Sequence, residues 1–161
     1  MRSMKNLVSI VSVSLLAVLQ LSMPGAAQAG KRRFISFDFP LAGVTDTEAT
    51  GITPSGVIAG RYFSSDHVEH GFVLENGEFT SIDVPGSTFT DLTWINAGGT
   101  IVGSYGSVDG TSKGYELKKG IFTTIDYPGS PETFGLFGIS DSGIIVGPLP
   151  PSDFEMRVIL R

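Results

Sequence analysis

The feature that most constrains the fold is a short pattern, Phe-x-x-apolar-Asp-apolar-Pro, which occurs three times. Its aspartates are 45 and 43 residues apart: Asp38, Asp83 and Asp126. Aromatic and β-branched residues alternate in the pattern with Ser and Thr, as in a half-buried strand that ends at a proline. A period in the forties, built from short glycine-punctuated β segments, is typical of stacked four-stranded units. The sequence therefore predicts an all-β repeat protein.

Residues 1–29 have the three parts of a secretory signal. Arg2 and Lys5 supply a positive start, Leu7–Leu21 is predominantly apolar, and Ala27-Gln28-Ala29 is a typical cleavage site. Several serines interrupt the apolar run and Pro24 follows it, which argues against a permanent membrane span. We expect cleavage after Ala29, a secreted or periplasmic protein, and no membrane association after cleavage.

The remaining chain, residues 30–161, has the length of a single domain with a real core. Its repeats span approximately 34–78, 79–121 and 122–161. The sequence contains no cysteine, which excludes disulfides, thiolate metal sites and a lipoprotein anchor. Without Arg2 and Lys5 the chain has nine basic and 16 acidic side chains, so nucleic acid is not an expected partner.

Glycines recur at two places when the three copies are aligned. One set ends the turn after the second segment of each copy and predicts positive φ angles: Gly56, Gly99 and Gly143. The other set lies in the middle of the third segment, where backbone or aromatic rings are expected to approach closely: Gly60, Gly103 and Gly147.

Asn76-Gly77, between two β-type runs, predicts a type I′ hairpin. The fourth strand of one copy should therefore pair with the first strand of the next. With this phase, Phe34–Phe39 and Met156–Leu160 are each half of a hairpin. Such halves pair with each other in ring-shaped repeat folds and remove exposed edges.

Three stretches carry a resemblance to a known family: F-T-S-I-D-V-P-G from Phe79, W-I-N-A-G-G-T-I-V-G-S-Y from Trp94, and H-G-F-V-L-E-N-G from His70. This pattern resembles the bacterial extracellular HAF-family repeats, over nearly all of residues 30–161. The first copy departs from it at Thr53, where the family has Asn, and the third copy departs at Pro148 and is shortened. The resemblance implies an extracellular location and a β-propeller-like layout, without a defined activity.

Three units of this length leave two architectures open. We favour propeller-type blades, a partial propeller completed by a homodimer of six blades, and a β-trefoil-like fold is the alternative. A third interpretation is a truncated relic of a longer repeat protein, whose exposed edges would aggregate.

The recurring aspartates, Asp38, Asp83 and Asp126, have a functional and a structural interpretation. They could form a ring of calcium or sugar ligands, or each could accept backbone N–H groups in the turn before the proline. Because turn-forming residues must repeat in every copy, we favour the structural role. No D-x-D-x-D-G calcium loop occurs in the chain.

His67 and His70 could bind a metal together with Asp66, but a loop does not fix their spacing as a helix would. His70 also occupies the His of the H-G-F pattern. We therefore expect no metal and no cofactor.

Trp94, the single tryptophan, lies where the other copies have Gly51 and Gly138. Core packing is the commoner role for such a residue, whereas an exposed Trp94 could stack on a sugar face. The one G-x-S-x-G match, Gly110-Thr111-Ser112-Lys113-Gly114, lies between two β-type runs and does not precede a predicted helix, so it does not indicate a nucleophile elbow. A pair of carboxylates for glycoside hydrolysis would meet only in the fold.

The sequence thus predicts a secreted, non-enzymatic repeat protein that binds an extracellular carbohydrate or protein ligand. We expect the contacts in the polar loops Phe63–Glu69 and Gly106–Lys113 and at Trp94. The candidate binding residues are Asp66, His67, His70, Trp94 and Asp109. The alternative from another class is a secreted hydrolase or lyase that acts on polysaccharide through a carboxylate pair.

Overall fold

The computed structural model describes residues 33–126, 135–148 and 156–159. The chain divides by its contacts into two units, Met1–Ile35 and Ser36–Arg161, and of the first unit only residues 33–35 are described. All the described strands lie in the second unit. No helix occurs among the described residues, so none there is long and apolar enough to cross a membrane.

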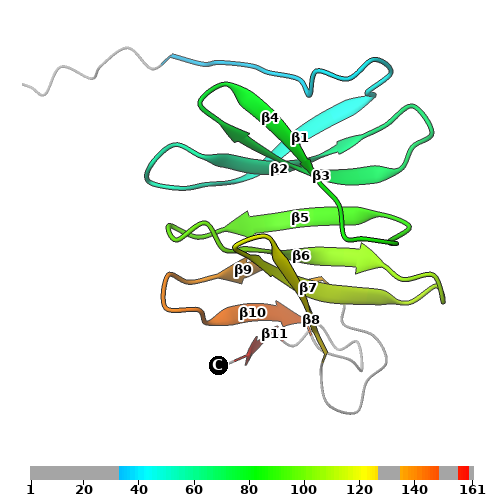
Figure 1. The fold of residues 1–161 in the computed structure, drawn as a ribbon. Coiled ribbons are helices and arrows are strands. Elements are labelled where there is room, and N and C mark those ends of the chain that lie inside the picture. Colours follow the sequence, from blue (N-terminus) through cyan, green and yellow to red (C-terminus); the bar gives the residue numbers. More distant parts are fainter. Residues whose placement is uncertain (1–32, 127–134, 149–155, 160–161) are drawn as a thin grey trace, which may run out of the picture. The chain divides into compact units, whose positions relative to one another are not determined.

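The second unit is all-β, with antiparallel strands in three sheets (Figure 1). The first sheet has the order β1 (Asp46–Ile52), β2 (Ile58–Phe63), β3 (Glu69–Glu75), β4 (Glu78–Ile82). The second sheet repeats this order with β5 (Thr90–Ile95), β6 (Ile101–Gly106), β7 (Ser112–Lys118), β8 (Ile121–Ile125). The third sheet consists of β9 (Gly138–Ile139), β10 (Ile145–Pro148) and β11 (Met156–Ile159), with β10 in the middle.

The hairpin between β3 and β4 has the turn that its sequence predicts. Asn76 and Gly77 have φ angles of 53° and 85°, and Glu75 lies opposite Glu78. Lys119 and Gly120 make the same turn between β7 and β8, with φ angles of 52° and 77°. Each of the first two sheets therefore ends with the strand that begins the next copy of the sequence.

One expectation about the ends of the repeat array is wrong. Phe34–Phe39 does not form a strand, whereas β11 has no described first strand of a next copy beside it, in agreement with the phase of the repeats. A strand requires a neighbour to satisfy its backbone groups, and no described strand lies beside Phe34–Phe39. Phe37 and Phe39 instead pack on the first sheet, where Phe39 stacks on Tyr62 with ring centroids 3.8 Å apart.

A polar side chain closes the turn between the first two strands of every sheet. Thr53 Oγ1 accepts a hydrogen bond from the Val57 N–H at 3.0 Å. Asn96 Oδ1 and Ser140 Oγ accept the corresponding bonds, from Thr100 and Ile144, at 2.9 and 3.0 Å. The glycine of each turn has the predicted positive φ: 90° at Gly56, 75° at Gly99 and 87° at Gly143.

The mid-strand glycines allow an aromatic ring of the neighbouring strand to lie against the backbone, as predicted. A Cβ atom on Gly60 would lie 2.7 Å from the Phe72 ring, and one on Gly103 would lie 2.9 Å from the Tyr115 ring. Both rings are fully buried. At Gly147 a Cβ atom would lie 3.0 Å from the Gly135 carbonyl oxygen.

The second sheet carries two apolar cores, one on each face. Ile101 and Tyr115 belong to the core that includes Ala59 of the first sheet. Val102, the next residue along β6, packs instead with Ile139 and other residues of the third repeat. Since successive residues of a strand point to opposite faces, the first and third sheets lie on opposite faces of the second.

We expect Gly103→Ala to lower the free energy of unfolding by at least about 2 kcal/mol, because its Cβ would overlap the Tyr115 ring and the Asp91 carbonyl group. Urea unfolding monitored by circular dichroism measures the change. Gly98→Ala is the matched control, since a Cβ there meets only Asn96 Oδ1, at 3.4 Å. Equal losses in the two variants would contradict the close-packing role of Gly103.

Candidate binding site

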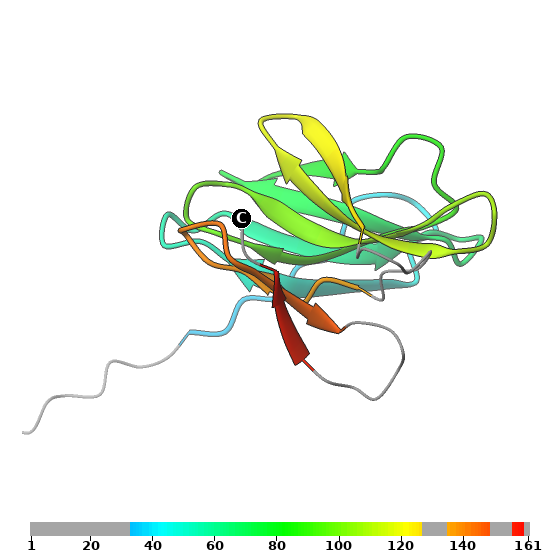
Figure 2. The ribbon, with the colours of Figure 1, turned by 90° about the horizontal axis from the view of Figure 1, so that it is seen from below.

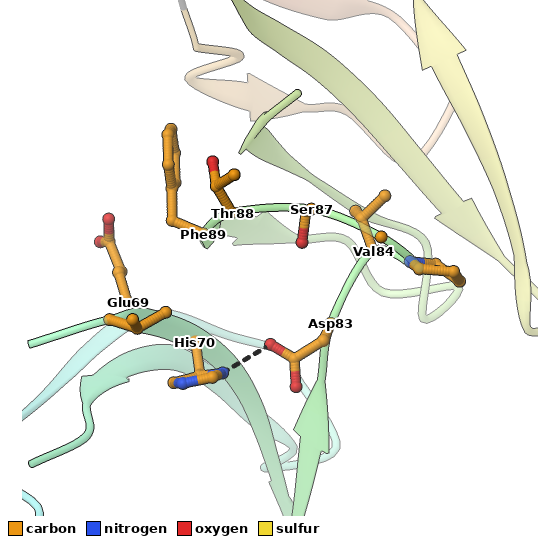
Figure 3. Close-up of a pocket in the computed structure, with 10 residues that line it drawn as sticks. Glu69, His70, Asp83, Val84, Ser87, Thr88 and Phe89 are labelled. Atoms are coloured by element: carbon orange, nitrogen blue, oxygen red, sulfur yellow. Dashed lines mark hydrogen bonds and ion pairs between the residues drawn. The ribbon is translucent and has the colours of Figure 1, made fainter. Parts of the chain in front are cut away.

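A pocket of about 240 Å³ lies between β3 and the loop that follows β4 (Figure 3). Glu69 and His70 line it from β3, and Asp83 lines it from the end of β4. Val68, which precedes β3, and the loop after β4 contribute the rest of the lining, the loop residues being Val84, Pro85, Gly86, Ser87, Thr88 and Phe89. The pocket thus combines acidic groups, hydroxyl groups and one aromatic ring.

His70 is held at both ring nitrogens. Its Nδ1 lies 2.8 Å from Asp83 Oδ1, the contact drawn in Figure 3, and its Nε2 lies 3.1 Å from Ser64 Oγ. Ser81 Oγ donates a hydrogen bond of 2.9 Å to the other oxygen of Asp83. The bonds of Asp83 therefore go to side chains, where we expected backbone N–H donors. This repeated aspartate holds a histidine that the second copy replaces with Lys113.

Hydrogen bonds link Ser64, His70 and Asp83 in the same order as the residues of a serine-hydrolase triad. No sequence motif indicates this arrangement. The serine is committed elsewhere, because its Oγ donates to Asp66 Oδ1 at 2.6 Å. This hydrogen bond lowers the pKa of Asp66. An ionised carboxylate so close would oppose the negative charge that a serine nucleophile develops. In this arrangement the serine hydroxyl donates to Asp66, whereas a triad requires it to donate to the histidine.

Asp66, His67 and Asp109 shape the two loops that the sequence marks for binding. Asp109 Oδ1 accepts hydrogen bonds from the backbone N–H and the hydroxyl of Thr111, at 3.0 and 2.7 Å, and these bonds lower its pKa. His67 has a φ of 63° at the position where the second loop has Gly110. No group of three His, Asp or Glu side chains suited to a metal occurs in the described part of the chain.

One cation, Arg61, lies among three carboxylates between the first two sheets. It contacts Glu48 at 2.7 Å through Nη2, and its Nη1 lies 3.3 Å from Glu69 and 3.2 Å from Asp91. Burial raises the pKa of Asp91, and Arg61 opposes that rise. Burial and the neighbouring Asp91 raise the pKa of Glu69.

Glu69 and Asp91 are two neighbouring carboxyl groups whose pKa values burial raises, as the general acid of a glycoside hydrolase requires. Glu69 Oε1 and Asp91 Oδ1 both contact the same guanidinium nitrogen, Arg61 Nη1. Of these two acids, only Glu69 lines the pocket. A general acid and a nucleophile must both face the scissile bond. This pair is therefore arranged as an ion network that joins the sheets.

Trp94 lies on a separate surface and is 42% exposed, so its expected core role is wrong. It is surrounded by three other exposed apolar residues: Ile52 (64%), Phe137 (49%) and Ile144 (38%). We call these four residues the Trp94 surface. Exposed apolar residues from all three repeats in one place indicate a contact surface.

A groove borders Trp94 on each side. The groove toward the first sheet has a volume of about 330 Å³ and is lined by Gly51, Ile52 and Ile58 among others. The groove toward the third sheet has a volume of about 380 Å³ and is lined by Phe137 and Ile144 among others. Because the equivalents of Trp94 are Gly51 and Gly138, both neighbouring repeats leave space beside the indole ring.

The structure thus distributes the five candidate residues over three places. His70 lines the pocket, Trp94 dominates its own surface, and Asp66, His67 and Asp109 belong to loop turns. Ile52, Phe137 and Ile144 were not predicted as site residues. Ile52 and Phe137 are adjacent in sequence to Gly51 and Gly138, the glycines that align with Trp94. This adjacency is the sequence feature that could have identified them as site residues.

No protein-family model matches the chain, and no curated protein matches it significantly in sequence.

We expect Arg61→Met to lower the free energy of unfolding by about 1–3 kcal/mol at pH 7, because three carboxylates lose their shared cation. The folded state raises the pKa of Glu69 and of Asp91, so their protonated forms favour folding and stability falls as the pH rises through those values. The penalty of the substitution should therefore shrink at pH 4. Urea unfolding at both pH values measures it.

Glu48→Gln is the control for this substitution, since Glu48 is the most exposed of the three acids. It should cost less than Arg61→Met at pH 7. A penalty of Arg61→Met that is equal at pH 4 and pH 7 would show that lost packing, and not charge, explains the effect.

Proposed function

We propose that this chain is a secreted, non-enzymatic protein of the HAF-repeat type, whose sheets are propeller-type blades that bind a carbohydrate chain at the Trp94 surface. The observation that carries the proposal is the exposure of the single tryptophan between two apolar grooves. A structural tryptophan is normally buried, since its large apolar surface contributes most to stability inside the core.

The blade interpretation is supported by how the sheets are built and packed. Two sheets have four antiparallel strands in sequence order, and each takes its last strand from the start of the next sequence copy. The sheets pack through their faces, with the second between the first and the third. Face-to-face packing of such sheets favours a propeller over a β-trefoil.

The chemistry of the Trp94 surface favours a sugar chain over a small polar ligand. An indole ring and flanking aliphatic groups complement the flat, apolar faces of sugar rings, whose hydroxyl groups stay in water. The grooves on both sides of Trp94 extend the surface toward the first and the third repeat. A linear polysaccharide segment longer than one ring fits this arrangement better than a single sugar.

The competing hypothesis, a polysaccharide hydrolase or lyase, is favoured by one observation. Glu69 lines the His70 pocket and burial raises its pKa, as a general acid requires. The other carboxylate of this pocket, Asp83, is held by His70 and Ser81, and Asp91 does not line the pocket, which argues against the hypothesis.

The proposal is tested by titrating the protein with linear hexasaccharides of β-1,4-linked glucose, xylose and N-acetylglucosamine. We expect one class to change the fluorescence of Trp94 with saturation and without released products. In calorimetry, Trp94→Ala should weaken binding at least about tenfold, because the stacking platform is lost. Trp94→Phe should retain part of the affinity.

Val108→Ala is the control, since Val108 is an exposed apolar residue in the loop between β6 and β7 and lines neither groove beside Trp94. It should leave the affinity unchanged. Released sugar products would support the hydrolase hypothesis instead. Binding that survives Trp94→Ala but not Val108→Ala would move the site to the loops, and no binding of any hexasaccharide would contradict the carbohydrate proposal.

A further inference from the structure

The outer face of the first sheet is covered by a short segment, Ser36–Phe39. Phe37 lies 6.3 Å from Phe72 and 5.9 Å from Phe79 between ring centroids. Phe39 stacks on Tyr62, with centroids 3.8 Å apart and planes at 6°. Tyr62 and Phe72 are buried as a result.

This segment repeats the contacts that the end of β4 makes with the second sheet. In the aligned copies Phe37 and Phe39 correspond to Ile82 and Val84, and these two pack on the core that includes Tyr115. Tyr115 is in turn the counterpart of Phe72.

A backbone hydrogen bond repeats in the same way. The Phe39 N–H donates to Thr47 Oγ1 at 3.0 Å, and the Val84 N–H donates to Thr90 Oγ1 at 3.0 Å. Ser36–Phe39 is therefore placed on the first sheet as the last strand of a preceding sheet would be.

The described residues contain no strands of such a preceding sheet. β4 pairs with β3, and β8 pairs with β7. Beside Ser36–Phe39 no described strand is paired. Conversely, β11 pairs with β10 on one edge and with no described strand on the other (Figure 2).

The same chain does not bring these two halves together. The first and third sheets use opposite faces of the second sheet, as the cores around Ala59 and Ile145 show. For Ser36–Phe39 to pair with β11 of its own chain, Phe37 and Phe39 would have to leave the aromatic face where they are packed. That would expose Phe72 and Tyr62.

We propose that β11 pairs with the segment Phe34–Phe39 of a second copy of this chain, and that the third sheet of one copy packs on the first sheet of the other. The described residues of each copy provide one donor segment and one acceptor edge. In a dimer with a twofold axis, the donor segment of each copy pairs with the β11 edge of the other. No β11 edge then stays unpaired, and no sheet face stays open. This inference rests on the blade interpretation in the proposed function, and not on its ligand.

The hydrogen-bond register identifies the residue whose substitution tests the pairing. With the two-residue turn at Asn76-Gly77, Thr80 pairs with Val73 through hydrogen bonds, and Ser81 is opposite Phe72 without them. The counterparts in the donor segment are Ile35 and Ser36. Ile35→Pro therefore removes an N–H needed by the new strand pair, and Ser36→Pro does not.

The test is the solution mass of the secreted protein, expressed from its full sequence, by light scattering coupled to size exclusion. We expect the mass of two chains for the unmodified protein and for Ser36→Pro, and at least a tenfold weaker dimer for Ile35→Pro. Far-ultraviolet circular dichroism should show that all three proteins keep their β structure. Trp94→Ala should remain dimeric, which separates a failure of this inference from a failure of the ligand proposal.

A monomer for the unmodified protein would overturn the proposal. So would an Ile35→Pro dimer of undiminished affinity, because the two copies would then associate without strand donation. Open-ended polymers would also overturn it, since the paired ends would not close on a twofold axis.

Discussion

The structure depends on the way an aromatic residue of the third strand packs across the glycine of the second strand. Phe72 lies against Gly60, and Tyr115 lies against Gly103, so each ring fills the space that a side chain would occupy. The ring belongs to a core that the start of its own sequence copy covers, which is Ile82 and Val84 for Tyr115 and Phe37 and Phe39 for Phe72. Sheets of this kind cannot stand alone, because each aromatic face requires a cover.

The first and third repeats differ from the second in what covers them. The second sheet is packed on both faces, whereas among the described residues a short segment, Ser36–Phe39, covers the outer face of the first. The Trp94 surface lies across all three repeats, and its four apolar side chains are between 38% and 64% exposed. Association of copies through the sheet faces and binding of a ligand at Trp94 therefore use different parts of the molecule.

Much of the fold could be predicted from the sequence because the chain contains its own alignment. Asn76-Gly77 identified the hairpin, and the three mid-strand glycines identified close packing. The failure at Phe34–Phe39 has a physical cause: a strand pattern gives the tendency of a segment, but a strand forms only beside a partner edge. The polar residues that close the turns, Thr53, Asn96 and Ser140, are visible in the alignment once their common role is known.

The candidate sites were less predictable, since they depend on contacts distant in sequence. Asp83 meets His70 across a hairpin, and Arg61 gathers acids from three other strands. No spacing rule signals either arrangement. Trp94 was correctly singled out as a departure from its repeat, but only the structure shows its exposure.

The central claim is that Phe34–Phe39 completes a sheet of a second copy. Hydrogen exchange of the Ile35 and Phe37 amides tests it most directly, with Thr80 and Ile82, their counterparts in β4, as the internal reference. The account predicts that both pairs of amides exchange slowly and to similar extents. Exchange of Ile35 and Phe37 at the rate of a solvent-exposed chain, while Thr80 and Ile82 remain protected, would contradict it.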